Sequence, residues 1–253
     1  MDALLFDFDG TIAETERLGH RVAYNAAFAQ LGLDWTWDTK LYGELLAIGG
    51  GKERIAHYLD RYRNGGRVYG DRAELIAAIH ERKQQLFNAL APSIAIRPGV
   101  RRVVREARAA GVRLAIVTTA ARAGVDAILA REPELRDAFD FIAAGDVVPH
   151  KKPAPDIYVY VLAALGLRAE RCVALEDAAI GLRAARAAGI ATLITVSEYT
   201  RDEDFSGAAA VVSDLGEPAA PLHLLAGAPP PEGFVNLAYL RRLLAIGPTH
   251  HPA

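Results

Sequence analysis

Short apolar runs alternate with helical patterns along much of this chain, and the alternation predicts its fold. The runs read as buried strands at residues 3–8, 112–118, 139–143, 171–175 and 190–196. Patterns typical of helices separate most of them, at 99–110, 121–131, 155–166 and 178–188. Strand and helix in alternation, with continuous apolar strands, are typical of a parallel sheet covered on both faces. We therefore predict an α/β fold built on a Rossmann-like parallel sheet.

Residues 14–92 interrupt this rhythm. They carry helical patterns and no strand pattern, with the expected helices at about 15–31, 38–47, 53–63 and 72–90. Turns are expected at Gly49-Gly50-Gly51 and at Asn64-Gly65-Gly66. We predict two domains, an α/β core of residues 1–13 and 93–253 and an inserted helical cap of residues 14–92. A last helix is expected near 235–245, and residues 250–253 are expected to fray.

The composition argues against several classes of function. The chain has 253 residues and a formal net charge of −2, which gives no electrostatic footprint for nucleic acid or an anionic membrane. Its one cysteine, Cys172, lies in a predicted strand, where we expect core packing in a reducing cytoplasm. No apolar stretch reaches the roughly 18 residues of a membrane span, and no signal peptide is recognisable. We expect a cytoplasmic monomer that acts on a small molecule.

The first strand carries the strongest chemical signal. It leads directly into Asp7 and Asp9, whose i, i+2 spacing points both carboxylates to the same side of an extended segment. Gly10 then lets the backbone turn away. Two like charges at one strand end repel unless a cation separates them or one is protonated. The pair therefore indicates a divalent metal, acid–base chemistry or both, the alternative being a plain turn after a solvated strand end.

Polar residues also end later strands of the predicted sheet. Since parallel strands present their carboxyl ends at one edge, we expect these residues to meet there. The candidates are Thr118 and Thr119, Lys152, and the pair Glu176 and Asp177. Each has a structural alternative: an ordinary strand threonine, a solvated lysine pair with Lys151, or an acidic helix start. We assign Lys151 to the surface or a loop.

Together these motifs resemble those of the haloacid dehalogenase-like hydrolases, in the phosphatase and phosphomutase branch whose helical cap follows the first motif. The matching residues are Asp7-Phe8-Asp9-Gly10-Thr11, Thr118, Lys152-Pro153-Ala154-Pro155-Asp156 and Glu176-Asp177. Other segments resemble the CbbY proteins of Calvin-cycle bacteria, namely Ala13-Glu14-Thr15-Glu16, Asp34-Trp35, Trp37-Asp38 and Gly50-Gly51-Lys52-Glu53-Arg54. Those proteins act on sugar bisphosphates, notably xylulose 1,5-bisphosphate.

The resemblance implies a role for each core motif. Asp7 would be the nucleophile that forms an aspartyl phosphate, and Asp9 the general acid and base. Mg²⁺ would be held by the metal ligands Asp7, Glu176 and Asp177 and by the backbone carbonyl of Asp9. Lys152, Thr118 and the N–H of Thr119 would contact the phosphoryl oxygens.

The cap supplies the candidate specificity residues. Gly50 and Gly51 join flexible backbone to Lys52 and Arg54, which suits a second phosphate group, although a charged helix start would look the same. Residues expected to contact the sugar are Glu16, His20, Tyr42 and Arg122. Two positions depart from the family: its histidine comes one residue earlier, where this chain has Gly19, and an Asn often stands at Ala121.

The sequence therefore predicts a Mg²⁺-dependent phosphatase that acts on a sugar phosphate, foremost a sugar bisphosphate such as xylulose 1,5-bisphosphate. A phosphosugar mutase of the β-phosphoglucomutase type shares these motifs, and no residue in the chain separates the two. A phosphorylation-dependent receiver, or a non-catalytic Mg²⁺-binding module, is the alternative from another class. The long cap after Asp7 argues against it, because a signalling surface needs no lid.

Overall fold

A computed structural model describes residues 1–63 and 71–246. Within these residues one mostly parallel sheet of seven strands forms in the order β3-β2-β1-β4-β5-β6-β7, and only the β6–β7 pair is antiparallel. The strands are β1 (Ala3–Phe6), β2 (Arg113–Thr118), β3 (Phe141–Ala144), β4 (Cys172–Glu176), β5 (Ala191–Thr195), β6 (Ala210–Val212) and β7 (Leu224–Gly227). The predicted α/β fold and Rossmann-like parallel sheet are confirmed, and β6 and β7 were not predicted.

The strand register brings the polar motifs to one edge of the sheet. In the centre, β1 pairs with β2 on one side and β4 on the other, and Phe6 lies opposite both Ile116 and Leu175. Because the strands are parallel, the residues just after these three positions lie at the same edge of the sheet. Asp7, Thr118 and Glu176 are therefore neighbours although up to 169 positions of sequence separate them.

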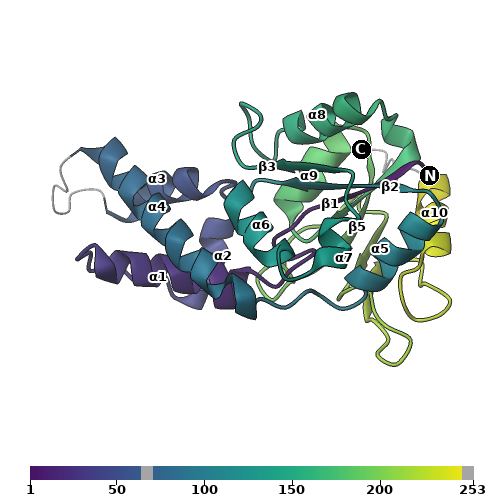
Figure 1. The fold of residues 1–253 in the computed structure, drawn as a ribbon, viewed down its shortest axis with the longest axis horizontal. Coiled ribbons are helices and arrows are strands. Elements are labelled where there is room, and N and C mark those ends of the chain that lie inside the picture. The colour runs from purple at the N-terminus through teal and green to yellow at the C-terminus, as the bar shows by residue number, and fades with distance from the viewer. Residues whose placement is uncertain (64–70, 247–253) are drawn as a thin grey trace.

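Helices cover both faces of the sheet (Figure 1). Leu4 and Phe6 of β1 belong to the cluster formed with α5 (Val100–Ala109), α6 (Arg122–Leu129), the short α7 (Pro133–Arg136) and α10 (Leu237–Ile246). Ala3 and Leu5 point to the other face, toward α8 (Asp156–Leu165) and α9 (Ala179–Ala187). This alternation follows from the two-residue period of a strand. The remaining short helical turns are η2 (Ala91–Ser93) and η3 (Ala169–Arg171).

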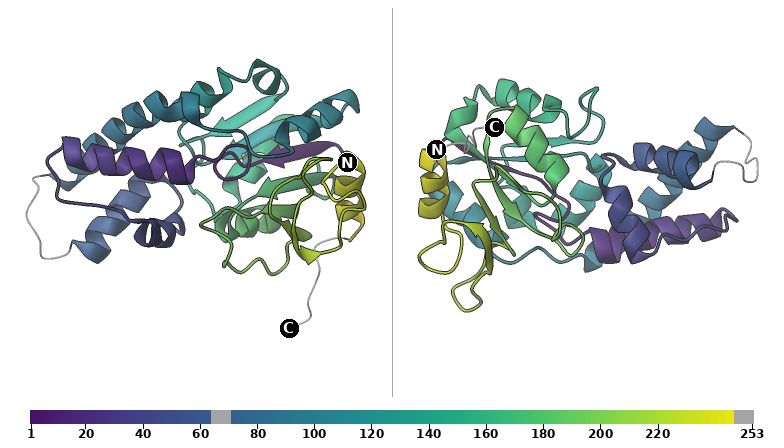
Figure 2. Two further views of the ribbon diagram at one scale, coloured as in Figure 1. Left: turned by 90° about the horizontal axis from the view of Figure 1, so that it is seen from below. Right: turned by 180° about the vertical axis from the view of Figure 1, so that it is seen from behind.

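The helical segments between β1 and α5 lie beyond the sheet at one end of the molecule (Figures 1 and 2). They are η1 (Glu16–His20), α1 (Arg21–Gln30), α2 (Thr39–Leu46), α3 (Gly51–Tyr62) and α4 (Arg72–Leu90). The side chains of Asp38 and Asp71 cap α2 and α4 by accepting from backbone N–H groups. An aromatic cluster of their own, which includes Phe28, Trp37 and Tyr58, packs these helices together.

The predicted division at residues 14 and 92 stays a prediction. The expected turn at Asn64-Gly65-Gly66 and the expected frayed end at residues 250–253 lie outside the described residues. Cys172 begins β4 and is fully buried, as expected for a core residue. Among residues 1–63 and 71–246, no helix has the length and hydrophobicity needed to cross a lipid bilayer.

Candidate active site

Lys152 links the ends of three strands in a buried cluster. Its ammonium group donates to Asp7 Oδ1 at 2.6 Å, to Glu176 Oε1 at 2.7 Å and to the carbonyl oxygen of Val117 at 2.9 Å. Tyr158 of α8 donates its hydroxyl to the same Glu176 oxygen. Burial alone would lower the pKa of Lys152, but the carboxylates of Asp7 and Glu176 outweigh it and raise that pKa. Lys152 therefore stays charged beside Asp7.

Three buried carboxylates converge at this edge. One oxygen from each of Asp7, Glu176 and Asp177 lies within 4.8 Å of the others. Burial and the neighbouring carboxylates raise the pKa values of Asp7 and Asp177 well above their ordinary range, although Lys152 lowers that of Asp7. This charge repulsion is what a divalent cation would relieve, and the oxygen donors are those that Mg²⁺ prefers. The residues present fit such an ion.

Glycines make room for two of these carboxylates. A Cβ at Gly10, where φ is +75°, would overlap the carboxylate of Asp177, and a Cβ at Gly181 would overlap that of Glu176. Asp177 and Glu176 are themselves buried. The first turn after β1 and the start of α9 thus approach the carboxylates as closely as backbone can.

Asp9 faces away from this cluster, toward the helical region. His20 Nε2 lies 3.1 Å from Asp9 Oδ1, and Lys83 Nζ of α4 lies 2.9 Å from Nδ1 of the same ring. An ammonium group can only donate, so Nδ1 accepts and Nε2 carries the proton that faces Asp9. Burial would raise the pKa of Asp9, but the contact with His20, aided by Thr15 and Lys83, lowers it to about 2.

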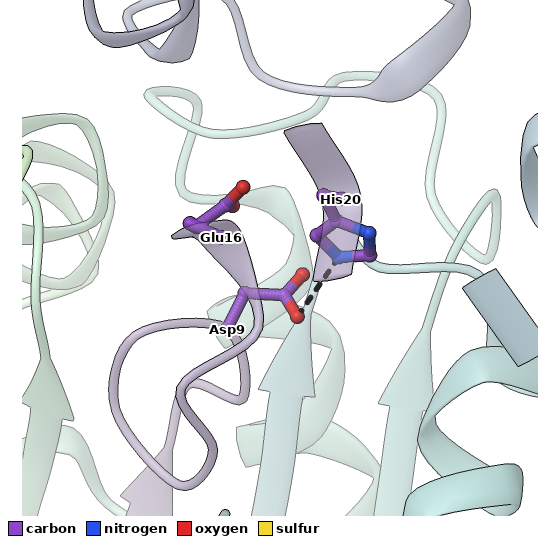
Figure 3. A group of neighbouring side chains, drawn as sticks. All are labelled: Asp9, Glu16 and His20. Carbon is purple, nitrogen blue, oxygen red and sulfur yellow. Dashed lines mark ion pairs between the residues drawn. The ribbon is translucent and has the colours of Figure 1, made fainter. Parts of the chain in front are cut away.

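A π-helical turn, η1, explains how His20 reaches Asp9. The backbone N–H of His20 donates to the carbonyl oxygen of Thr15 at 2.8 Å. This hydrogen bond spans five residues, whereas the hydrogen bonds of an α-helix span four. The wider turn accommodates one more residue than an α-helical turn would. Figure 3 shows His20 and Glu16 from this turn on either side of Asp9. Phe87 stacks on the imidazole, with ring centroids 4.0 Å apart.

Glu16 is held by residues of the helical region. Tyr42 of α2 donates its hydroxyl to Glu16 Oε2, and Arg54 Nη1 contacts that hydroxyl at 3.4 Å. Arg54 also donates to the carbonyl oxygens of Leu45 at 3.1 Å and Ile48 at 3.2 Å. Most of the guanidinium donors of Arg54 are therefore engaged inside the protein, and this side chain orients Glu16 through Tyr42.

A cavity of about 290 Å³ lies between the strand ends and the helical region. Of the residues predicted for the site, Tyr42 alone does not line it, because it lies behind Glu16. Thr118 is buried and accepts from the N–H of Ala120 at 3.1 Å, and Arg122 pairs with Asp126 at 2.9 Å. The predicted residues that line the cavity are Asp7, Asp9, Glu16, His20, Gly50, Gly51, Lys52, Arg54, Thr118, Thr119, Arg122, Lys152, Glu176 and Asp177.

Hydrogen bonds from Arg97 hold the loop that carries Asp9 in place. Arg97 is buried, and it donates to the carbonyls of Gly10, Thr195 (3.0 Å), Val196 (2.7 Å) and Ser213 (2.7 Å). A planar guanidinium with several fixed donors suits such a task better than an ammonium group. No sequence pattern indicates this role of Arg97, since its partners are backbone atoms distant in the chain.

Lys83 and Tyr158 are among the site residues that were not predicted, and each had a local signal. Lys83 interrupts the apolar stripe that Ile79 and Phe87 form on α4. Tyr158 lies on the buried face of α8, two residues after the Lys152–Asp156 motif. Lys151 was assigned to the surface or a loop. It lies in a loop, as this assignment allowed, but its side chain is only 13% exposed and lines the cavity, so it is not an ordinary solvated lysine.

Comparison with known proteins identifies the class. The sequence pattern of the haloacid dehalogenase-like hydrolases matches residues 1–189, and the chain belongs to this family. Within it, the chain is similar to the protein CbbY of Cereibacter sphaeroides, with 47% identity over 222 residues that cover 86% of this chain and 94% of the relative.

Two solved structures are also similar to this chain. A variant of CbbY from Rhodobacter sphaeroides in complex with xylulose 1,5-bisphosphate matches with a TM-score of 0.77 and 46% identity, covering 85% of this chain and 94% of that one. A β-phosphoglucomutase from Clostridium difficile matches with a TM-score of 0.76 but 22% identity, covering 97% and 98% of the two chains, and supports the fold alone.

Proposed function

We propose that this protein is a Mg²⁺-dependent phosphatase that hydrolyses a sugar bisphosphate through an aspartyl phosphate on Asp7. The observation that carries the proposal is the contact of buried Asp7 with Lys152 on the floor of the cavity. The contact aligns a carboxylate nucleophile beside a cation that can neutralise the oxygens of a phosphoryl group.

The reaction would run in two steps. In the first, Asp7 attacks phosphorus, a carboxylate O–P bond forms, the ester O–P bond breaks, and Asp9 gives a proton to the departing alcohol. In the second, Asp9 takes a proton from water, which attacks phosphorus and releases phosphate and Asp7. The contact with His20 keeps Asp9 ionised in the resting site, so its role as acid requires that the negative charge of a bound phosphate raise its pKa.

Asp7, Glu176, Asp177 and the carbonyl of Asp9 are the proposed ligands of Mg²⁺. When bound, the ion supplies positive charge to phosphoryl oxygens and keeps Asp7 ionised. Lys152 and Thr118 act beside it: the ammonium group neutralises charge on phosphoryl oxygens, and the threonine hydroxyl donates to them.

The substrate class follows from the helical region and from the relatives. Lys52 brings positive charge to the cavity away from Asp7, and Glu16, His20 and Arg122 bring hydrogen-bonding groups for a polyol. The complex of the Rhodobacter protein with xylulose 1,5-bisphosphate, at 46% identity, makes this pentulose bisphosphate the first candidate. A cavity between the strand ends and a helical region is not what a receiver or a silent metal-binding module requires.

The test is release of inorganic phosphate from a panel of sugar monophosphates and bisphosphates, with Mg²⁺ and with EDTA. We expect xylulose 1,5-bisphosphate to be hydrolysed best, and only with Mg²⁺. Asp7→Asn should abolish release, while Asp137→Asn, which alters an exposed carboxylate outside the cavity lining, should preserve it. A product that keeps both phosphates in new positions would identify a mutase instead.

We also propose that the protein is a monomer of the cytoplasm. A single buried cysteine needs no oxidising compartment. Size-exclusion chromatography with light scattering would test the monomer, and cell fractionation would test the compartment.

A further inference from the structure

Lys151 joins the helical region to the sheet. Its ammonium group lies 3.2 Å from Glu53 of α3 and 2.7 Å from Oδ1 of Asp146, which follows β3. Its side chain is only 13% exposed and lines the cavity beside Lys152. A Cβ at Gly50 would lie 2.8 Å from Cδ of Lys151, so glycine lets the start of α3 pack against this side chain.

Asp146 is shared between two lysines. Its Oδ2 lies 3.3 Å from Nζ of Lys52, on the far side from Lys151. The Asp146 side chain is 63% exposed, whereas Lys151 is largely buried. Lys151 and Lys52 hold the pKa of Asp146 below its ordinary value, so this carboxylate is an anion at neutral pH. Two ammonium groups of the cavity wall thus hold a solvent-facing anion between them.

The surroundings of these lysines are electropositive even with Asp146 in place. Burial, together with the charges of Lys83, Lys52 and Lys151, lowers the pKa of His80 on α4 to about 4. His80 is therefore neutral at pH 7 and adds donors or acceptors without charge. Arg54, another cation of the cavity lining, has most of its donors engaged with carbonyl oxygens and with Tyr42.

We propose that Lys151 and Lys52 together bind the second phosphate of the substrate, and that Asp146 occupies this site until the phosphate displaces it. The inference deepens the proposed function and rests on it. An exposed carboxylate in a lysine pair gains little from staying, because solvent screens it. A phosphate dianion carries more charge and more acceptor oxygens, so it can replace the carboxylate on both ammonium groups. A sugar monophosphate whose phosphate lies at Asp7 has no second phosphate that could displace Asp146 from the two lysines.

Equilibrium binding in the Asp7→Asn background tests the inference without turnover. The probes are xylulose 1,5-bisphosphate and its two monophosphates, titrated by calorimetry. Lys151→Gln should weaken bisphosphate binding about tenfold more than binding of either monophosphate, since a hydrogen bond to a charged group is lost. Asp146→Asn should tighten bisphosphate binding. Lys151→Arg should keep most of the affinity, and Lys40→Gln, on an exposed part of α2, should change nothing.

The two variants are expected to change the affinity for the bisphosphate in opposite directions. This distinguishes the inference from a structural latch, in which Lys151 and Asp146 serve only to hold α3 against the sheet. A latch between α3 and the sheet predicts that Lys151→Gln and Asp146→Asn both weaken binding, and by the same factor for all three probes. Either of those results would overturn the inference and leave the phosphatase proposal intact. If Lys151→Gln does not fold, as judged by circular dichroism, Lys151→Arg and Asp146→Asn decide the question. Absence of phosphate release from every ester by the unmodified protein would refute the proposed function instead.

Discussion

Gly10 lies against the carboxylate of Asp177, with no room for a side chain between them. We expect Gly10→Ala to displace Asp177 and to lower kcat/KM about 100-fold, the order expected for a small misplacement at a reacting centre. Gly111→Ala is the matched control, because φ is +69° there and a Cβ would meet nothing within 4 Å. Both variants should lose ~1–2 kcal/mol to left-handed strain. Equal activities in the two variants would contradict the role of this close packing.

Mg²⁺ should stabilise the protein through the three converging carboxylates. An ion that binds only the folded state raises the melting temperature in proportion to the logarithm of its concentration. Asp177→Asn removes one ligand and also one repelling charge. We therefore expect its metal-free form to melt no lower than the metal-free unmodified protein, while added Mg²⁺ no longer raises its melting temperature. Differential scanning calorimetry with EDTA and with Mg²⁺ measures both, and a Mg²⁺ shift retained in this variant would exclude Asp177 as a ligand.

Lys83 should make stability depend on pH in the alkaline range. Burial lowers its pKa from 10.5 to about 8, although Asp9 and Glu16 act in the opposite direction. Between these values the unfolded chain holds a proton that the folded protein has released, so the free energy of unfolding rises with pH. The rise should approach ~3 kcal/mol from pH 7 to pH 10, at about 1.4 kcal/mol for each pKa unit.

Urea unfolding at a series of pH values tests this dependence. The comparison is the unmodified protein against Lys83→Met, which cannot titrate, so contributions from other groups cancel. Lys40→Met, a lysine exposed on α2, is the control and should follow the unmodified protein. Parallel curves for the unmodified protein and Lys83→Met would show that Lys83 has an ordinary pKa.

Cys172 should be unreactive in the folded protein. Its side chain is fully buried, and burial raises the pKa of the thiol to about 11. The thiolate that reacts with a disulfide reagent is therefore scarce at pH 8, and the reagent has no access. We expect no release of thionitrobenzoate from the native protein and one equivalent in 6 M guanidinium chloride. Rapid reaction of the native protein would mean that β4 opens readily.

Patterns within a few neighbouring residues were sufficient to predict the central strands of the sheet. Strands β1 to β5 were recognisable because each is a continuous apolar run, and the motifs at their ends marked the site. Strand β6 has three residues, and all four residues of β7 are exposed, so neither shows the periodicity of a buried strand.

What escaped prediction depends on partners distant in sequence. Lys151 lies 98 residues from Glu53, and its sequence neighbours do not distinguish it from a solvated lysine. His20 was predicted to contact the sugar and does line the cavity, but its contact with Asp9 depends on the π-helical turn, which no sequence period indicated. Among the described residues, the Arg97 guanidinium donates to backbone carbonyls, whose positions follow from the tertiary structure.

The central position of β1 has a consequence for biosynthesis. Its hydrogen-bonding neighbours, residues 113–118 and 172–176, are translated long after residues 3–6, so the strand leaves the ribosome with both edges exposed. The buried members of the aromatic cluster of α1 to α4 are all translated by residue 79, so this cluster can collapse first. A nascent chain stalled before β4 would therefore carry the proposed nucleophile on an apolar, half-paired edge, a state in which chaperones are expected to bind.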